Sequence, residues 1–162
     1  MRLPGARAAQ AELAASYGIH GFCFYRYWFN GWQLLERPVN EIWESGQPEF
    51  PFCLCWANEN WTRQWDGLEN DVLLEQRYSV VDDLAHIRSL IPILLDRRYI
   101  ATFGSTTGRL LVYRSSRFPE PEKTTATWRR EAERVGLRVY FSFESKALSN
   151  LAIPALLASI LL

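Results

Sequence analysis

One run of residues limits the fold of this chain more than any other. Residues 51–57 form an apolar segment of strand type that changes abruptly into the polar cluster Asn58-Glu59-Asn60. A strand that is apolar at every position is buried on both faces, which is typical of parallel sheets in α/β proteins. In such folds ligands bind just beyond the carboxyl ends of the strands. Amide and carboxylate groups at this strand end therefore indicate a site for a hydroxyl-rich ligand.

Strand patterns alternate with helical patterns along the whole chain. The expected strands are 19–29, 51–57, 109–114 and 138–143, and the expected helices are 6–17, 39–44, 79–95 and 125–135. This alternation predicts an α/β fold built of parallel βαβ units whose strand ends all face one side. About four such units make part of a (β/α)₈ barrel, and a small open parallel α/β sheet with helices on both faces fits them equally.

Local signals place several of the element boundaries. Pro38 is suited to the first residue of a helix, and Ser79 with Asp82 three residues later resembles a capping box. Asn30-Gly31 predicts a turn. Residues 66–78 contain several acids without clear periodicity, which predicts a long loop over the strand ends.

Tryptophan is concentrated near the amino terminus. Six of the seven tryptophans lie within the first 65 residues, which indicates a binding surface, whereas core filling is the alternative. The formal net charge is +0, so nucleic acid and an anionic membrane are not expected partners.

The three cysteines are expected to be buried reduced thiols. Cys23, Cys53 and Cys55 lie in strand-type runs and show no recognised zinc spacing, so no metal and no cofactor are expected. Reduced thiols and the lack of a signal-peptide pattern predict a cytoplasmic protein. Residues 147–162 are apolar but too short to cross a bilayer, and they predict either a core-facing helix or an aberrant, truncated end.

Several motifs together resemble one known family. They are Tyr17-Gly18-Ile19-His20-Gly21-Phe22-Cys23-Phe24-Tyr25, Tyr27-Trp28-Phe29, Pro51 to Arg63, Trp65-Asp66-Gly67 and Asp82-Asp83-Leu84-Ala85-His86-Ile87. This set resembles the WbsX-like proteins, glycosyltransferases of lipopolysaccharide or surface-polysaccharide biosynthesis that are grouped with endo-α-mannosidase-like glycoside hydrolases. The resemblance implies a (β/α)₈ barrel that acts on glycans.

Two departures from the family pattern qualify the resemblance. Arg26 stands where a histidine is expected, and the carboxylate motifs near the carboxyl end of family members have no counterpart after Arg138. The resemblance therefore implies a fragment, with residues 1–146 as a partial barrel domain and residues 147–162 as a separate apolar end.

Glu59 and Asp66 are the candidate catalytic carboxylates. Glu59 lies between two asparagines at a strand end, where it is expected either to act as a general acid or to hydrogen-bond sugar hydroxyls. Its alternative is a structural carboxylate paired with Arg63, and the alternative for Asp66 is a plain turn residue.

Nine further side chains are candidate glycan ligands, because indole rings stack on sugars and polar groups fix hydroxyl orientation. They are Tyr27, Trp28, Trp56, Asn58, Asn60, Trp61, Arg63, Trp65 and Arg114. Core packing is the alternative for Tyr27, Trp28 and Trp56, and simple solvent exposure for Arg114. His86, a lone histidine on a helix, is expected to be structural.

These features predict a carbohydrate-active protein that transfers or hydrolyses glycosidic bonds at a Trp-lined cleft. The expected partners are an oligosaccharide or glycan and, as a second candidate, a sugar donor, with no nucleic acid and no stable membrane span. The alternative is a catalytically inactive glycan-binding fragment that lacks the distal acid/base pair.

Overall fold

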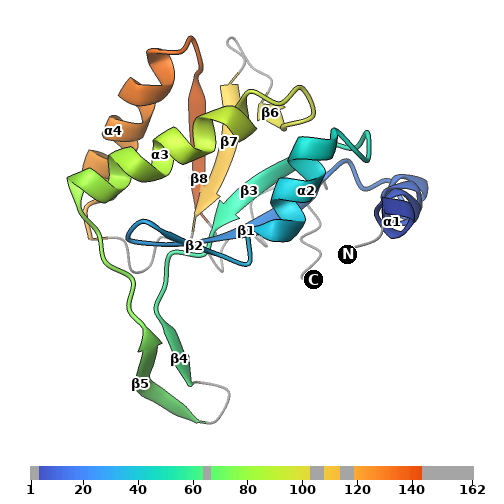
Figure 1. Ribbon diagram of the computed structural model, residues 1–162. Helices are drawn as coiled ribbons and strands as arrows, with labels where there is room; N and C mark the ends of the chain where they lie inside the picture. Colours follow the sequence, from blue (N-terminus) through green and yellow to red (C-terminus); the bar gives the residue numbers. More distant parts are fainter. Residues whose placement is uncertain (1–3, 64–66, 103–107, 114–118, 144–162) are drawn as a thin grey trace.

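The computed structural model describes residues 4–63, 67–102, 108–113 and 119–143 (Figure 1). The elements in chain order are α1 Pro4–Ser16, β1 Phe22–Phe29, β2 Trp32–Leu34, α2 Arg37–Ser45, β3 Phe52–Trp56, β4 Trp61–Arg63, β5 Leu68–Leu74, α3 Val80–Leu94, β6 Ala101–Thr102, β7 Gly108–Tyr113, α4 Pro121–Glu133 and β8 Val139–Phe143. The predicted alternation of strands and helices is confirmed.

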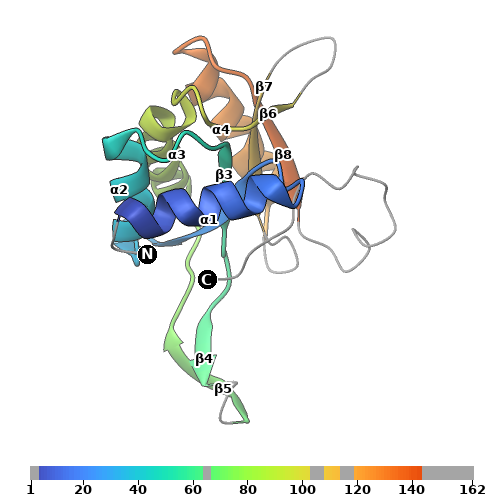
Figure 2. The same ribbon diagram turned by 90° about the vertical axis from the view of Figure 1, so that its right-hand side faces the viewer.

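The main sheet is mostly parallel and follows the order of the chain. β1, β3, β7 and β8 are parallel neighbours in that order, while β2 pairs antiparallel with β1 and β6 pairs antiparallel with β7. Right-handed crossovers between strands in simple chain order place successive helices on one face. α2, α3 and α4 indeed lie on the same face of the sheet (Figures 1 and 2).

This arrangement differs from an open sheet with helices on both faces. A doubly wound sheet needs a reversal of strand order, and the described strands show none. Chain-order winding is the arrangement found in (β/α)₈ barrels, yet the sheet does not close among the described strands. An α/β fold is therefore confirmed, and the barrel stays a proposal.

The hydrophobic core lies between the sheet and the helices. Side chains of β3 that point to the helices, Phe52, Leu54 and Trp56, meet α3 and α4 and are almost completely buried. Along a strand alternate residues point to opposite faces. Cys53 and Cys55 therefore point to the face opposite α2, α3 and α4, which we call the second face, and they are buried as well. This double burial is what the unbroken apolar run predicts.

Most predicted helix boundaries are correct within a few residues. The side chain of Ser79 accepts a hydrogen bond from the backbone N–H of Asp82 at 3.1 Å, as expected of an N-cap. Gly46 ends α2 in the left-handed region at φ 67°. α4 begins at Pro121 rather than at residue 125, because its first turn is polar and carries no apolar periodicity.

The prediction of a loop over residues 66–78 is wrong. β5 occupies most of this segment and pairs antiparallel with β4, and the resulting hairpin projects away from the sheet (Figure 1). Residues 70–73 are all exposed, so neither side of the strand is shielded and no apolar alternation arises. The pairing also contains two register shifts. For these reasons the segment carries no strand signal.

Candidate functional site

The ends of β1 and β3 meet at one edge of the sheet. Arg26 is the register partner of Trp56, and the backbone N–H of Ala57 donates to the carbonyl of Arg26 at 3.1 Å. The polar cluster follows immediately, so Asn58-Glu59-Asn60 lies beside the carboxyl end of β1. The expected meeting of these strand ends is confirmed.

Two of the candidate tryptophans lie in the core on the helix side. Trp28 and Trp56 are 7% and 1% exposed. His86 of α3 stacks on Trp28 with ring centroids 4.8 Å apart and the planes 1° apart, and it packs edge-on against Trp56 at 4.6 Å. Burial leaves Trp56 without an exposed face for a sugar ring. Both indoles therefore support the strand ends from inside the core.

Two other candidate aromatics lie on the second face. Tyr27 points there by strand alternation, and Trp61 packs against it at 5.3 Å and against Phe29 at 5.4 Å, in both cases edge-on. Tyr27 and Trp61 are only half-buried. The sequence cannot distinguish these residues from Trp28 and Trp56, because the assignment depends on which face of β1 the helices cover.

The two asparagines of the polar cluster hold the base of the hairpin. The Tyr78 hydroxyl donates to the backbone carbonyl of Asn58 at 2.5 Å. The backbone N–H of Gln76 donates to Asn60 Oδ1 at 2.7 Å. These bonds connect the segment leaving β3 with the segment returning toward α3, and they fix the point at which the hairpin departs.

Two buried acceptors in this region have no hydrogen-bond donor among the residues that the structure describes. They are Asn58 Oδ1, on a side chain that is 0% exposed, and Gln76 Oε1. A buried acceptor without a donor costs about 1 to 3 kcal/mol, so such groups are normally satisfied by water or by a ligand hydroxyl. The hairpin base is therefore a place suited to a donor that the described residues do not supply.

Glu59 lies between these asparagines and is half-buried. Arg63 on β4 reaches Asp71 on β5 at 3.5 Å in an exposed ion pair. Because this pair is exposed, it is worth little to stability, and it leaves the Arg63 guanidinium at the surface of the hairpin.

A buried polar network lies behind the strand ends. Trp28 Nε1 donates to Asp82 Oδ1 at 2.9 Å, and Thr124 Oγ1 donates to Asp83 Oδ2 at 2.6 Å. Arg26 Nε donates to His86 Nε2 at 3.3 Å. The sequence predicts Asp82 only as part of a capping box and gives neither Asp82 nor Asp83 a place in the candidate site. Their signal was the Asp-Asp pair in the first turn of α3, which ordinary helix capping explains equally well.

Burial shifts the protonation of this network. It raises the pKa of Asp82 and of Asp83, and the hydrogen bonds from Trp28 and Thr124 act in the opposite direction. Burial and then the charge of Arg26 lower the pKa of His86 well below its usual value. His86 is therefore neutral at pH 7, and its complete burial is consistent with a structural role.

Arg26 is a buried cation held by neutral groups. Besides His86 it donates to Ser89 Oγ at 2.7 Å and to Gln33 Oε1 at 3.2 Å. Burial lowers its pKa to about 10, so it stays charged at neutral pH. Among the described residues no carboxylate forms a direct ion pair with it, but the charge of Glu36 favours its charged form.

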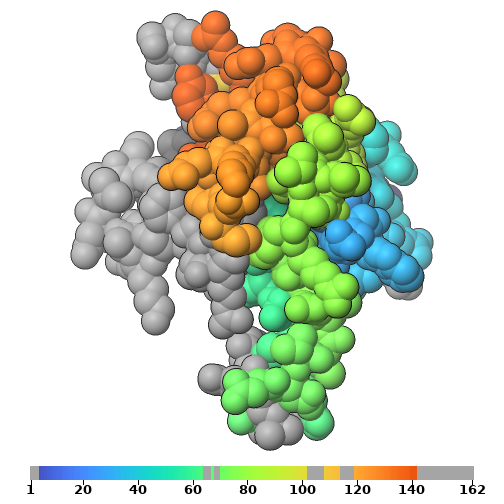
Figure 3. Space-filling model, turned by 90° about the vertical axis from the view of Figure 1, so that its left-hand side faces the viewer, coloured from blue at the N-terminus to red at the C-terminus, as the bar shows by residue number. Residues whose placement is uncertain are grey.

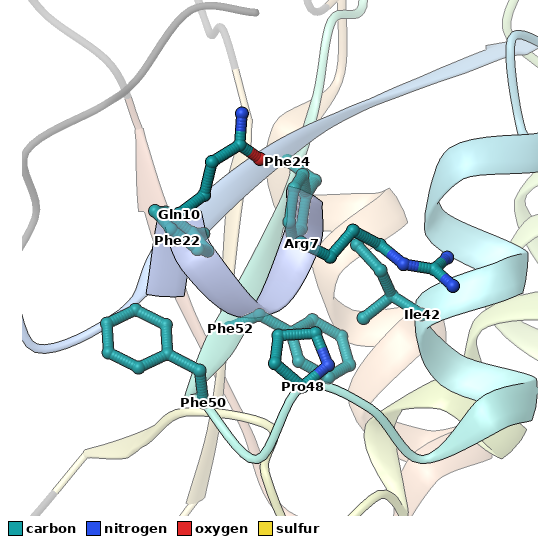
Figure 4. Close-up of a pocket in the computed structure, with 8 residues that line it drawn as sticks. All are labelled: Arg7, Gln10, Phe22, Phe24, Ile42, Pro48, Phe50 and Phe52. Carbon is teal, nitrogen blue, oxygen red and sulfur yellow. The ribbon is translucent and has the colours of Figure 1, made fainter. Parts of the chain in front are cut away.

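A small cavity lies at the opposite, amino-terminal end of the strands (Figure 4). It is lined by Arg7, Gln10, Phe22, Phe24, Ile42, Pro48, Phe50 and Phe52, and its volume of about 10 Å³ is close to that of a single water site. The Arg7 guanidinium points away from the phenyl rings in Figure 4 and pairs with Glu41 at 3.4 Å. We assign this cavity to packing of α1 rather than to function.

Comparison with known proteins places the chain in a family. Residues 1–155 match the family described as "Glycosyltransferase WbsX". This chain belongs to the WbsX glycosyltransferase family. Two relatives are proteins described as "Uncharacterized protein WxcX", from two strains of Xanthomonas campestris pv. campestris, each 44% identical over 129 residues. The match covers 80% of this chain and 18% of each relative. No solved structure matches.

Three predicted site residues of this WbsX family member lie outside the described residues. They are Trp65, Asp66 and Arg114, and the expected apolar end at 147–162 lies outside them as well. Among the described candidates, Tyr27, Trp61, Asn58, Asn60 and Glu59 gather at the strand ends and the hairpin base. Trp28 and Trp56 lie beneath them.

Cys23 and Cys53 are register partners on the second face. No disulfide joins the three cysteines. Hydrogen bonds from the Cys53 and Cys55 thiols lower the pKa of Cys23 to about 4, against the effect of burial.

Within the described part of the chain, no group of three or more His, Cys, Asp or Glu residues could hold a metal ion. A search of the same residues found no helix with the length and apolarity needed to cross a membrane.

Proposed function

We propose that this chain forms part of a carbohydrate-active protein of surface-polysaccharide or lipopolysaccharide biosynthesis. The observation that carries the proposal is the wall at the ends of β1 and β3. There the half-buried rings of Tyr27 and Trp61 adjoin the Asn58-Glu59-Asn60 cluster. Aromatic faces and amide groups are the combination that recognises sugar rings and hydroxyls. Family membership supports the same substrate class.

The expected chemistry is carboxylate catalysis. Glu59 and Asp66 are the two candidate carboxylates, and glycosidic bond chemistry commonly uses a pair. In transfer, a carboxylate accepts the proton of the attacking acceptor hydroxyl. In hydrolysis, a protonated carboxyl donates its proton to the leaving glycosidic oxygen, while the second carboxylate activates water or attacks the sugar.

The fold supports this placement. Active sites of (β/α)₈ barrels lie at the carboxyl ends of the strands, and the polar cluster stands at such an end. The chain-order winding of β1, β3, β7 and β8 favours a partial barrel over the open-sheet alternative. The three thiols, none of which forms a disulfide, favour a cytoplasmic location.

A glycan-binding chain without catalysis is the second candidate. The chain spans 18% of the length of the two relatives, and the distal carboxylate motifs implied by the resemblance are absent after Arg138. Under this alternative the aromatic and amide wall binds a glycan, and the acid/base pair is not present in this chain.

Two variants separate the candidates. Glu59→Gln removes the candidate carboxylate with little change in shape, and Glu133→Gln, on the exposed face of α4, is the matched control. With glycan and a sugar donor, we expect Glu59→Gln to lower turnover at least about 100-fold with little change in binding. Turnover of Glu59→Gln equal to that of the control contradicts the catalytic role. Binding without turnover in the unaltered chain favours the second candidate.

A further inference from the structure

Trp32 is an exposed indole that belongs neither to the hydrophobic core nor to the candidate site at the strand ends. It is the first residue of β2 and is 74% exposed. It follows the turn at Asn30 and Gly31, whose φ angles of 45° and 90° are both positive. Asn-Gly with two positive φ angles is the preferred tight turn of a β-hairpin. The backbone therefore fixes the position of Trp32 without any contribution from its ring.

The pairing of β2 with β1 places Trp32 on the second face. Trp32 is the register partner of Phe29, and directly opposed residues of an antiparallel pair point to the same face. Phe29 is the ring against which Trp61 packs at 5.4 Å. Trp32 and Trp61 therefore both border Phe29 on the second face, although they come from different hairpins.

A single exposed aromatic residue needs no explanation. Trp32 differs because its cross-strand partner Phe29 is buried, 3% exposed, and packs against the half-buried Trp61, so that Trp32 and Trp61 flank one buried ring on the same face. It also lies on a short hairpin whose shape is already set by Asn30-Gly31. An indole has only two rotatable side-chain bonds, and on a fixed backbone it therefore loses little entropy when a flat apolar partner binds. The apolar faces of a sugar ring supply such a partner.

We propose that Trp32 is a second stacking platform, so that the site takes an oligosaccharide of at least two rings, one beside Trp61 and one on Trp32. This inference rests on the proposed function, because it assumes that the wall at the strand ends binds glycan. It adds the substrate class, an extended saccharide rather than a single sugar, and a specificity-determining residue.

The test is calorimetric titration of the unaltered chain, Trp32→Ala and Trp32→Phe with mannose-containing mono-, di-, tri- and tetrasaccharides. Loss of one stacked ring is expected to weaken binding about three- to tenfold. For Trp32→Ala we expect that loss with the longer saccharides and no change with the monosaccharide. Trp32→Phe keeps an aromatic face and should retain most of the affinity.

The control is Tyr17→Ala, which removes an aromatic side chain of 80% exposure that follows α1. Equal affinity of Trp32→Ala and the unaltered chain for every saccharide length overturns this inference and leaves the proposed function intact. The same holds if Tyr17→Ala weakens binding as much as Trp32→Ala. If no saccharide binds the unaltered chain, both the inference and the proposed function fail. Thermal unfolding of each variant confirms that the fold is retained.

Discussion

His86 should make this chain lose stability in mild acid. Its ring is fully buried between Trp28, Trp56 and Trp128, and burial and Arg26 lower its pKa well below the usual value. Below pH 6.5 the unfolded chain takes up a proton at this site and the folded chain does not. Stability therefore falls as pH falls. The loss between pH 7 and pH 5 is about 2 kcal/mol for an unfolded pKa of about 6.5.

The surrounding ionisable groups act differently over this range. Arg26 stays charged, since its pKa is about 10. Asp82 and Asp83 have raised pKa values, so each adds stability as pH falls through its folded value. The unaltered chain alone therefore reports a sum of opposing effects, and a variant is needed to isolate the histidine.

The assay is urea unfolding at pH 7, 6 and 5 for the unaltered chain and His86→Asn. Asparagine keeps a hydrogen-bond acceptor for Arg26 and does not titrate, while the two aspartates are common to both proteins. The stability difference between the two proteins should shrink by about 2 kcal/mol from pH 7 to pH 5. A difference that is the same at all three pH values would refute the burial of a neutral histidine.

Two further predictions concern the core and the thiols. Trp128→Ala, which removes a ring packed against Trp56 at 5.5 Å, should cost about 3 to 5 kcal/mol of unfolding free energy. In the same urea assay Val135→Ala, at an exposed position, should change the unfolding free energy by less than about 0.5 kcal/mol. Equal losses of unfolding free energy in the two variants would contradict the packing described. Cys23, with its pKa lowered to about 4, should be alkylated by iodoacetamide at nearly the same rate from pH 6 to pH 8. The alkylation rate of an ordinary thiol rises about 75-fold over that range. Such a rise at Cys23, measured by mass spectrometry, would disprove the low pKa.

The sequence predicts the main elements because their signals are local. The apolar run ending at Ala57 specifies a buried strand, and Ser79 and Gly46 specify helix ends. The β4–β5 hairpin was missed because its strands project into solvent and carry no apolar alternation. The two short antiparallel strands β2 and β6 were missed because strands of two or three residues are too short to show a period.

The position of the candidate site could be predicted from the sequence, but which of its aromatic residues are buried and which are accessible could not. Trp28 and Trp61 look equivalent in the sequence, yet one is buried against His86 and the other is half-buried on the second face. That difference depends on which side of β1 the helices cover, which is a property of the whole sheet. The role of α3 in supporting the site was equally hidden. Figure 3 shows α3 and α4 side by side, with the hairpin below them, and their buried Asp83–Thr124 bond joins residues 41 positions apart in the chain.

The measurement that tests the central claim most directly is a saccharide titration of this chain beside Trp61→Ala, followed by tryptophan fluorescence and calorimetry. We predict saturable binding of mannose-containing oligosaccharides to the unaltered chain at millimolar concentration or below. Trp61→Ala should weaken that binding about three- to tenfold. The absence of any response at millimolar saccharide, or equal binding by Trp61→Ala, would contradict a glycan site at the ends of β1 and β3.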